Sequence, residues 1–245
     1  MGGRRYRRWP KRRGKLRGAM LWPLILLALG CAIYAADRWN LALQTYYSAA
    51  HFGIATLRSS TDFNHNGVDD YTDILLGARE DAEKRPRYDG SYQPGGYPPD
   101  NIGVCTDVIW RAFKQAGYSL KDMVDQDMAA HPDLYPQEPV PDPNVNFRRV
   151  PNLKVFFERH ALSLTTDTAQ IAEWQPGDIV TFGTRHIGIL SDRRNAQGIP
   201  FIIHNAGQPR REEDALTRFG TPISGHYRFD TSRLDAAVLI TFAGP

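Results

Sequence analysis

Cysteine is nearly absent from the 245-residue chain, which contains only Cys31 and Cys105. Because Cys105 is the single cysteine after residue 31, no disulfide within the rest of the chain can account for it. A lone cysteine is most often a small, buried apolar residue, and its main alternative is a chemical role. The sequence around Cys105 and the histidines that follow it therefore carry the functional interpretation.

Acidic residues are missing from the first 17 positions, which hold nine basic side chains. Removing these nine charges from the net charge of +3 leaves −6 for the remainder, so the part that follows is mildly acidic. A nucleic-acid-binding domain is therefore not expected. The basic head, residues 1–18, contains Arg4, Arg5, Arg7, Arg8, Lys11, Arg12, Arg13, Lys15 and Arg17.

Charge is also absent from residues 19–36, a largely apolar run that is long enough to cross a bilayer as a helix. The basic head would stay in the cytoplasm, so the sequence predicts a single-pass protein of the inner membrane with its C-terminal part in the periplasm or extracytoplasmic space. A cleaved signal peptide is the nearest alternative, although no clean small-x-small site follows. A lipoprotein at Cys31 ranks third, because Ala28 stands where leucine is usual.

Beyond the apolar run, residues 37–60 carry apolar side chains at roughly helical spacing, which predicts an amphipathic connecting helix. Residues 61–245 are expected to form one domain. Within it, residues 85–101 are rich in proline, glycine and tyrosine, so they form either one wall of a substrate groove or a plain surface loop.

Residues 62–73 match the ligand positions of an EF-hand-like calcium loop, with Gly67 at the sixth place, where the chain must turn sharply. An aspartate takes the twelfth place, where glutamate is usual. The alternative is a metal-free turn that caps the next helix. The loop predicts a structural Ca²⁺ ion held by Asp62, Asn64, Asn66, the Val68 carbonyl, Asp70 and Asp73.

Residues 105–117 show apolar side chains at three- and four-residue spacing and end in a glycine, which predicts a helix with Cys105 in its first turn. Unpaired N–H groups and the helix dipole favour a thiolate there, so a lowered thiol pKa is expected. Three strands are predicted at 179–182, 186–191 and 200–204. In an antiparallel hairpin, His186 and His204 should meet at one end of the sheet and, if paired directly, share a face.

Four motifs together resemble the papain-like cell-wall cysteine peptidases of the NlpC and CHAP type, and more closely an uncharacterised bacterial subfamily of exported proteins. They are Gly103-Val-Cys-Thr-Asp107, Pro176-Gly-Asp-Ile-Val180, His186-Ile-Gly-Ile189 and Ile202-Ile-His-Asn205. The resemblance implies an α+β papain-like fold, in which the helix of the nucleophile packs on an antiparallel sheet. It also implies hydrolysis of amide bonds in peptidoglycan peptides.

Carried over position by position, the resemblance makes Cys105 the nucleophile, His186 the general base and acid, and His204 the residue that orients His186. Asn205 could take the orienting role instead. Three other functions stay open: a noncatalytic, calcium-dependent wall-binding or scaffolding module, an acyltransferase or transglutaminase-like enzyme, and a zinc site formed by Cys105, His186 and His204. The sequence makes no prediction about the oligomeric state or the bond that is cut.

Overall fold

A computed structural model describes residues 21–38, 40–41 and 43–244, and the chain divides into two compact units, residues 1–42 and 43–245. In the first unit, α2 (Leu21–Arg38) covers most of the predicted membrane span, while residues 19–20 and the basic head lie outside the described residues. Among the residues that the structure describes, none of the helices combines the length and apolarity that crossing a bilayer requires.

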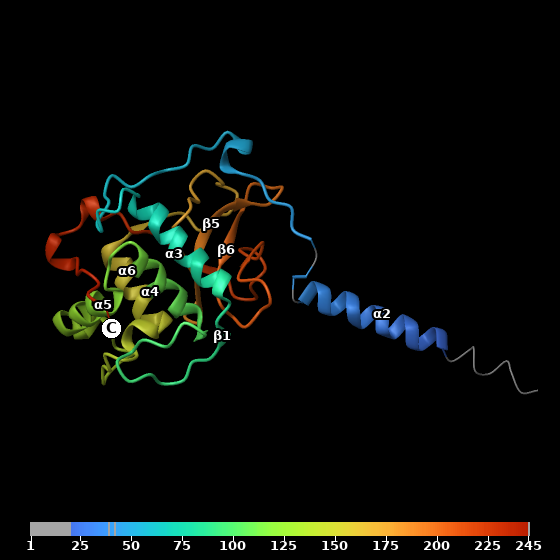
Figure 1. Ribbon diagram of the computed structural model, residues 1–245, viewed down its shortest axis with the longest axis horizontal. Helices are drawn as coiled ribbons and strands as arrows, with labels where there is room; N and C mark the ends of the chain where they lie inside the picture. Colours follow the sequence, from blue (N-terminus) through green and yellow to red (C-terminus); the bar gives the residue numbers. More distant parts are fainter. Residues whose placement is uncertain (1–20, 39, 42, 245) are drawn as a thin grey trace, which may run out of the picture. The chain divides into compact units, whose positions relative to one another are not determined.

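The second unit is an α+β structure built on an antiparallel six-stranded sheet with the strand order β3-β8-β4-β5-β6-β7 (Figure 1). Its strands are β3 (Leu162–Ser163), β4 (Ile179–Phe182), β5 (His186–Arg194), β6 (Pro200–Ile203), β7 (Glu212–Glu213) and β8 (Ile223–Arg228). A separate parallel pair is formed by β1 (Arg87–Tyr88) and β2 (Ile102–Gly103).

Figure 1 shows the main helices of this unit gathered on one side of β5 and β6. They are α3 (Asp70–Lys84), α4 (Cys105–Gln115), α5 (Leu120–Ala130) and α6 (Val150–His160). Five short 3₁₀ helices lie at Ala49–Phe52, Pro132–Leu134, Asn146–Arg148, Thr231–Arg233 and Ala236–Val238.

The helix that begins at Cys105 packs on one face of the sheet. Its apolar stripe is almost fully buried: Val108, Ile109, Ala112 and Phe113 are each 1% exposed or less. The stripe shares a core with sheet residues Ile179, Ile187, Ile189 and Ile203. Each fully buried valine, isoleucine or phenylalanine side chain contributes about 1.5–3 kcal/mol, so packing holds α4 at a defined place on β5.

Alternation along the strands builds a second, smaller core on the opposite face of the sheet. This core contains Trp174, Val180, Phe182, Leu190, Ile202, Ala215 and Leu216. Ile187 and Ile189 therefore belong to the α4 side, whereas Leu190 belongs to the other.

The predicted helix over residues 37–60 is wrong from residue 43 onward. Residues 43–60 contain only the 3₁₀ turn Ala49–Phe52, which ends at Gly53 with φ +68°. Tyr47 instead pairs with Arg194 through two backbone hydrogen bonds, and the Leu57 N–H donates to the Gln175 side chain. Because Arg194 and Gln175 bind backbone groups of this segment, those groups are hydrogen-bonded although the segment forms no helix.

The loop at 62–73 is followed by a helix, as predicted, but is not preceded by one. Asp69 caps α3 by accepting a hydrogen bond from Thr72 N–H. The residues before the loop, 54–60, have no regular secondary structure. The predicted connecting helix over residues 37–60 therefore does not lead into the loop, whereas the helix expected after the loop is present as α3.

Candidate active site

Cys105 is the first residue of α4, one residue after the N-cap Val104, as the helix pattern predicted. Cys105 is 6% exposed and belongs to the apolar core. Burial raises the pKa of the Cys105 thiol to about 11, although the backbone N–H groups of Ile187, Thr106 and Cys105 itself oppose the shift. The predicted lowering of this pKa is wrong, because loss of solvation outweighs the stabilisation from the helix N-terminus.

Asp107 anchors the start of α4. It is fully buried and accepts hydrogen bonds from Val104 N–H at 2.7 Å and from the Trp110 indole at 2.9 Å. Arg148 binds the same carboxylate through both Nε and Nη2, at 2.8 and 2.9 Å. The backbone around Cys105 is therefore tied to a buried ion pair, which holds the cysteine in place.

His186 and His204 come together, as predicted. His186 Nε2 lies 3.0 Å from His204 Nδ1, and the two rings are perpendicular with centroids 4.9 Å apart. Phe219 stacks on His186 at 4.8 Å. Burial, with a smaller contribution from His204, lowers the pKa of His186 to about 3, so its imidazole is neutral at pH 7.

The two histidines are diagonal neighbours and do not pair directly. Leu190 pairs with Ile202 and Ile189 with Ile203, a register that places Gly188 opposite His204. His186 lies two residues from Gly188 and so shares its face. A Cβ atom at Gly188 would lie 2.9 Å from the backbone carbonyl oxygen of Ile203 and 2.6 Å from Ile202 Cδ1, so a larger residue would require the strands to shift.

Glu213 completes a chain of buried polar groups that the sequence did not reveal. Its Oε1 lies 3.1 Å from His204 Nε2, and both residues are less than 5% exposed. Gln208 Nε2 also contacts the His204 ring. Glu213 lies on the two-residue strand β7, which is too short to show an apolar pattern, so no sequence signal could have placed it.

The contact with Glu213 favours one pair of tautomers. With the Glu213 carboxylate as acceptor, His204 Nε2 carries the proton, and His204 Nδ1 then accepts from His186 Nε2–H. The remaining nitrogen of His186, Nδ1, is then unprotonated and has no hydrogen-bond partner among the described residues. It is therefore the basic atom of the site.

Asn205 does not orient His186. Its amide Nδ2 donates to the carbonyls of Pro86 and Gly103 at 3.3 and 3.0 Å, and its Oδ1 accepts from Gly207 N–H. Asn205 thus ties the end of β6 to the segments that lead to Cys105. The orienting contact on His186 comes from His204.

Cys105 lies beside the start of β5, because the N–H that acts on its sulfur belongs to Ile187, the next residue after His186. No hydrogen bond joins the sulfur to either imidazole in the part of the chain that the structure describes. Ile187 faces α4, whereas His186 contacts Phe182 and Phe219 on the other side of the strand. Proton transfer thus requires the sulfur and His186 Nδ1 to approach each other.

Tyr88 supplies a partly exposed wall beside the cysteine. Strand β1 pairs with β2, which sets Tyr88 beside Gly103, two residues before Cys105. Burial raises the pKa of Tyr88, and negative charge on Cys105 and Asp107 adds to that shift. Tyr88 is 51% exposed, consistent with a position at the entrance to the site.

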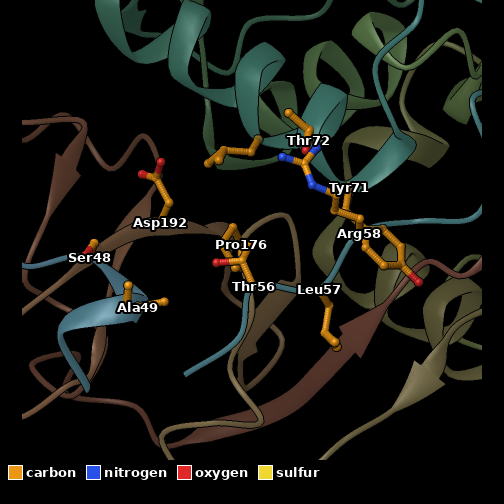
Figure 2. A pocket seen from close by; sticks show the side chains of 11 residues that line it. Ser48, Ala49, Thr56, Leu57, Arg58, Tyr71, Thr72, Pro176 and Asp192 are labelled. Atoms are coloured by element: carbon orange, nitrogen blue, oxygen red, sulfur yellow. The ribbon is translucent and has the colours of Figure 1, made fainter. Parts of the chain in front are cut away.

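One cavity of this unit lies away from the cysteine and the two histidines. A pocket of about 320 Å³ opens between the 43–60 segment, α3 and β5, and Figure 2 shows Ser48, Tyr71, Pro176 and Asp192 around it. None of Cys105, His186 and His204 lines this pocket. Substrate access to the cysteine is therefore not explained by this cavity.

The residues of the predicted calcium loop divide into two groups. Asn64 and Asn66 both donate to Asp73, whereas Asp70 turns toward Thr61, Tyr118 and Thr231. Within residues 21–38, 40–41 and 43–244, no group of three or more His, Cys, Asp or Glu side chains is arranged to hold a metal ion.

Residues 75–229 match the family described as "Domain of unknown function (DUF1287)". A similar relative is the Escherichia coli (strain K12) protein named "Uncharacterized protein YijF", which is 39% identical over 167 residues. The alignment covers 64% of this chain and 80% of that protein. No solved structure matches the chain.

These comparisons correct the resemblance drawn from the motifs. The assignment to the papain-like NlpC and CHAP peptidases is wrong, because the family that matches is DUF1287 and the relative is described only as uncharacterised. Short motifs around a cysteine and two strand histidines can arise wherever a helix packs on an antiparallel hairpin, so they do not define that family.

Proposed function

The chain belongs to the DUF1287 family, and we propose that it is a cysteine-dependent hydrolase of amide bonds, with Cys105 as nucleophile and His186 as general base and acid. The observation that carries the proposal is the buried chain from Glu213 through His204 to His186. This chain leaves Nδ1 of His186 without a hydrogen-bond partner among the described residues. His186 directly precedes Ile187, whose N–H group acts on the sulfur of Cys105. A nucleophile, a base and a group that orients the base are the parts that acyl transfer through cysteine requires.

The pKa values favour a neutral resting pair. Because burial raises the pKa of Cys105 to about 11 and lowers that of His186 to about 3, neither residue is charged at pH 7 before substrate binds. Proton transfer from Sγ to His186 Nδ1 would therefore accompany attack on the carbonyl carbon. Catalytic contacts are often long in the absence of substrate and shorten in the complex.

The remaining steps follow from the same groups. The N–H of Cys105, at the start of α4, is a candidate donor to the oxyanion of the tetrahedral intermediate. His186 then returns the proton to the leaving amine, and water releases the acyl group from sulfur. His204 and Glu213 stabilise the transient imidazolium.

The substrate class rests on the N-terminal sequence. The basic head and the uncharged run at 19–36 predict export, which would present the domain to peptidoglycan. Peptide amide bonds of peptidoglycan are therefore the first substrate to test.

The test uses the full-length protein purified in detergent and incubated with peptidoglycan, with released fragments separated by chromatography and identified by mass. Wild type and Cys31→Ser, which removes the only other cysteine, are expected to release the same fragments. Cys105→Ala is expected to reduce release by at least about 100-fold. Equal release by Cys105→Ala and wild type would rule out the proposed nucleophile.

The burial of Cys105 favours a second candidate, a noncatalytic wall-binding module in which the cysteine only packs. Such a module would co-sediment with peptidoglycan and release nothing, and Cys105→Ala would bind as well as wild type. Binding without fragment release by the wild type would select this function over hydrolysis.

A further inference from the structure

In the loop at 62–73, backbone N–H groups of the loop bind the side chain of Asp62. Both oxygens of Asp62 accept backbone hydrogen bonds, from Asn66 N–H at 3.1 Å and Gly67 N–H at 2.8 Å. Gly67 has φ +89°, a left-handed conformation that glycine adopts without strain. The loop thereby closes on itself and presents the side chains of Asn64 and Asn66 toward Asp73.

One carboxylate oxygen of Asp73 lacks a hydrogen-bond partner among the described residues. Asp73 is 1% exposed, and its Oδ2 accepts from the amide groups of Asn64 and Asn66, at 2.9 Å each. Its Oδ1 is buried and has no partner in hydrogen-bonding geometry among the described residues, although the Gln115 side chain also acts on this carboxyl group. Because a buried carboxylate oxygen without a partner is unfavourable, this atom favours a positively charged group, which none of the described residues supplies there.

Asp70, three residues earlier, is satisfied. Its Oδ1 accepts from Phe63 N–H, and its Oδ2 accepts from the hydroxyl groups of Thr61, Tyr118 and Thr231. These hydrogen bonds give Asp70 a structural role between the loop, the end of α4 and the C-terminal segment. The structure therefore separates Asp70 from the other predicted ligands.

We propose that this loop binds one Ca²⁺ ion through oxygen atoms of Asp62, Asn64, Asn66, Asp73 and the Val68 carbonyl, without Asp70. The donor set contains only oxygen atoms and two carboxylates, which suits a hard divalent cation and not zinc. The ion would neutralise the unpaired oxygen of Asp73. The Oδ1 atoms of Asn64 and Asn66, which accept from Asn66 N–H and Val68 N–H, would bind the ion through their remaining lone pairs, so Asn64 Nδ2 would keep its hydrogen bond to the Gln115 carbonyl.

The site would act on the helix of the candidate nucleophile from its far end. Asn64 Nδ2 donates to the carbonyl of Gln115, the last residue of α4, at 2.8 Å. Phe63 stacks on Tyr118 with centroids 4.2 Å apart. A Cβ atom at Gly117, where φ is +89°, would lie 2.8 Å from Asn64 Cβ. An ion in the loop would therefore stabilise the C-terminal turn of α4.

The test is thermal unfolding of the full-length protein in detergent after removal of metals with EGTA. Added CaCl₂ at about 100 times its Kd is expected to raise the Tm of wild type by roughly 5–10 °C. Hydrogen exchange of the amides at the end of α4 is expected to slow at the same time. Asp73→Asn keeps the shape of the side chain and removes its charge, so it is expected to abolish both effects.

His65→Asn is the matched control, because it lies within the loop at a non-ligand position, has φ +58° and should retain the full shift. Should Asp73→Asn not fold, Asp62→Asn takes its place. An unchanged wild-type Tm, an equal shift in the aspartate variant, or an equal shift with MgCl₂ would overturn the assignment. Because the readout is stability, failure here would leave the proposed hydrolase untouched.

Discussion

His204 Nε2 lies 3.1 Å from Glu213 Oε1, and both side chains are buried. Glu213 lies on β7, and His204 directly follows β6, the antiparallel neighbour of β7. Burial lowers the pKa of His204, while the hydrogen bond and charge of Glu213 act in the opposite direction. The pair therefore sets which nitrogen of His204 carries the proton, and through it the basic atom of His186.

The first prediction concerns this pair. Glu213→Gln removes the charge but keeps a side chain of the same shape, so His204 can adopt the other tautomer. We expect kcat on a peptidoglycan peptide to fall at least about 10-fold with little change in KM, since a carboxylate in this role contributes up to about 10⁴-fold. Nitrogen NMR should show a changed tautomer of His204.

The control for this variant is Glu212→Gln, on the same short strand. Glu212 pairs with Arg79 and Arg193, whereas the carboxylate that binds the His204 ring is that of Glu213. Its kcat is expected to stay within about twofold of wild type. Equal losses in the two variants would assign Glu213 a purely structural role.

The second prediction concerns the ionisation of Cys105. A thiol with a pKa raised to about 11 should react with iodoacetamide at a rate that still rises above pH 10, because only the thiolate reacts. At pH 8 we expect the rate to be roughly 100-fold or more below that of a free cysteine with a pKa of about 8.5. Cys31→Ser confines the reaction to Cys105, and alkylation is followed by mass.

A plateau below pH 8 would contradict this prediction and would show a thiolate stabilised by its surroundings. The direction of the pKa shift of Cys105 follows from the negative charge that forms when the thiol loses its proton. Burial disfavours an anion, and therefore shifts ionisation to higher pH.

The third prediction concerns the support of α4. Asp107→Ala leaves the Arg148 guanidinium, 5% exposed, without its carboxylate, and removes the acceptor for Val104 N–H. We expect the free energy of unfolding to fall by about 3–5 kcal/mol, as for other broken buried ion pairs. Urea denaturation measures the change.

The matched control is Asp100→Ala. Asp100 pairs with Lys84, and its side chain is 69% exposed. Exposed pairs contribute less than about 1 kcal/mol. A loss for Asp107→Ala no larger than that of the control would show that the buried pair does not stabilise the start of α4.

The elements around the candidate site were predictable where local pattern dominates. The helix from Cys105 ends at Gln115, and Gly117 follows with φ +89°, as its glycine stop indicated. The strand at 179–182 has the predicted bounds. Apolar periodicity and turn residues determine such elements through contacts between near neighbours in the chain.

Predictions from the sequence were wrong where contacts with residues far along the chain determine the local structure. Residues 43–60 have helical spacing, yet Tyr47 pairs with Arg194 and Leu57 with Gln175, contacts that no local pattern encodes. The β5–β6 register also differs, since the strands pair so that Gly188 lies opposite His204. That register is set by the turn that joins β5 to β6 and by the irregular strand pairing between Leu190 and Arg194.

The sequence by itself determined that Cys105 begins a helix, that His186 and His204 lie at one end of a hairpin, and that an oxygen-rich loop precedes α3. Each follows from the spacing of residues close together in the chain. Only the tertiary structure decided that the sulfur is buried, that Glu213 faces His204, and that Asp70 and Asp73 have different environments. Solvation and long-range pairing set these properties, and both depend on parts of the chain that meet only after folding.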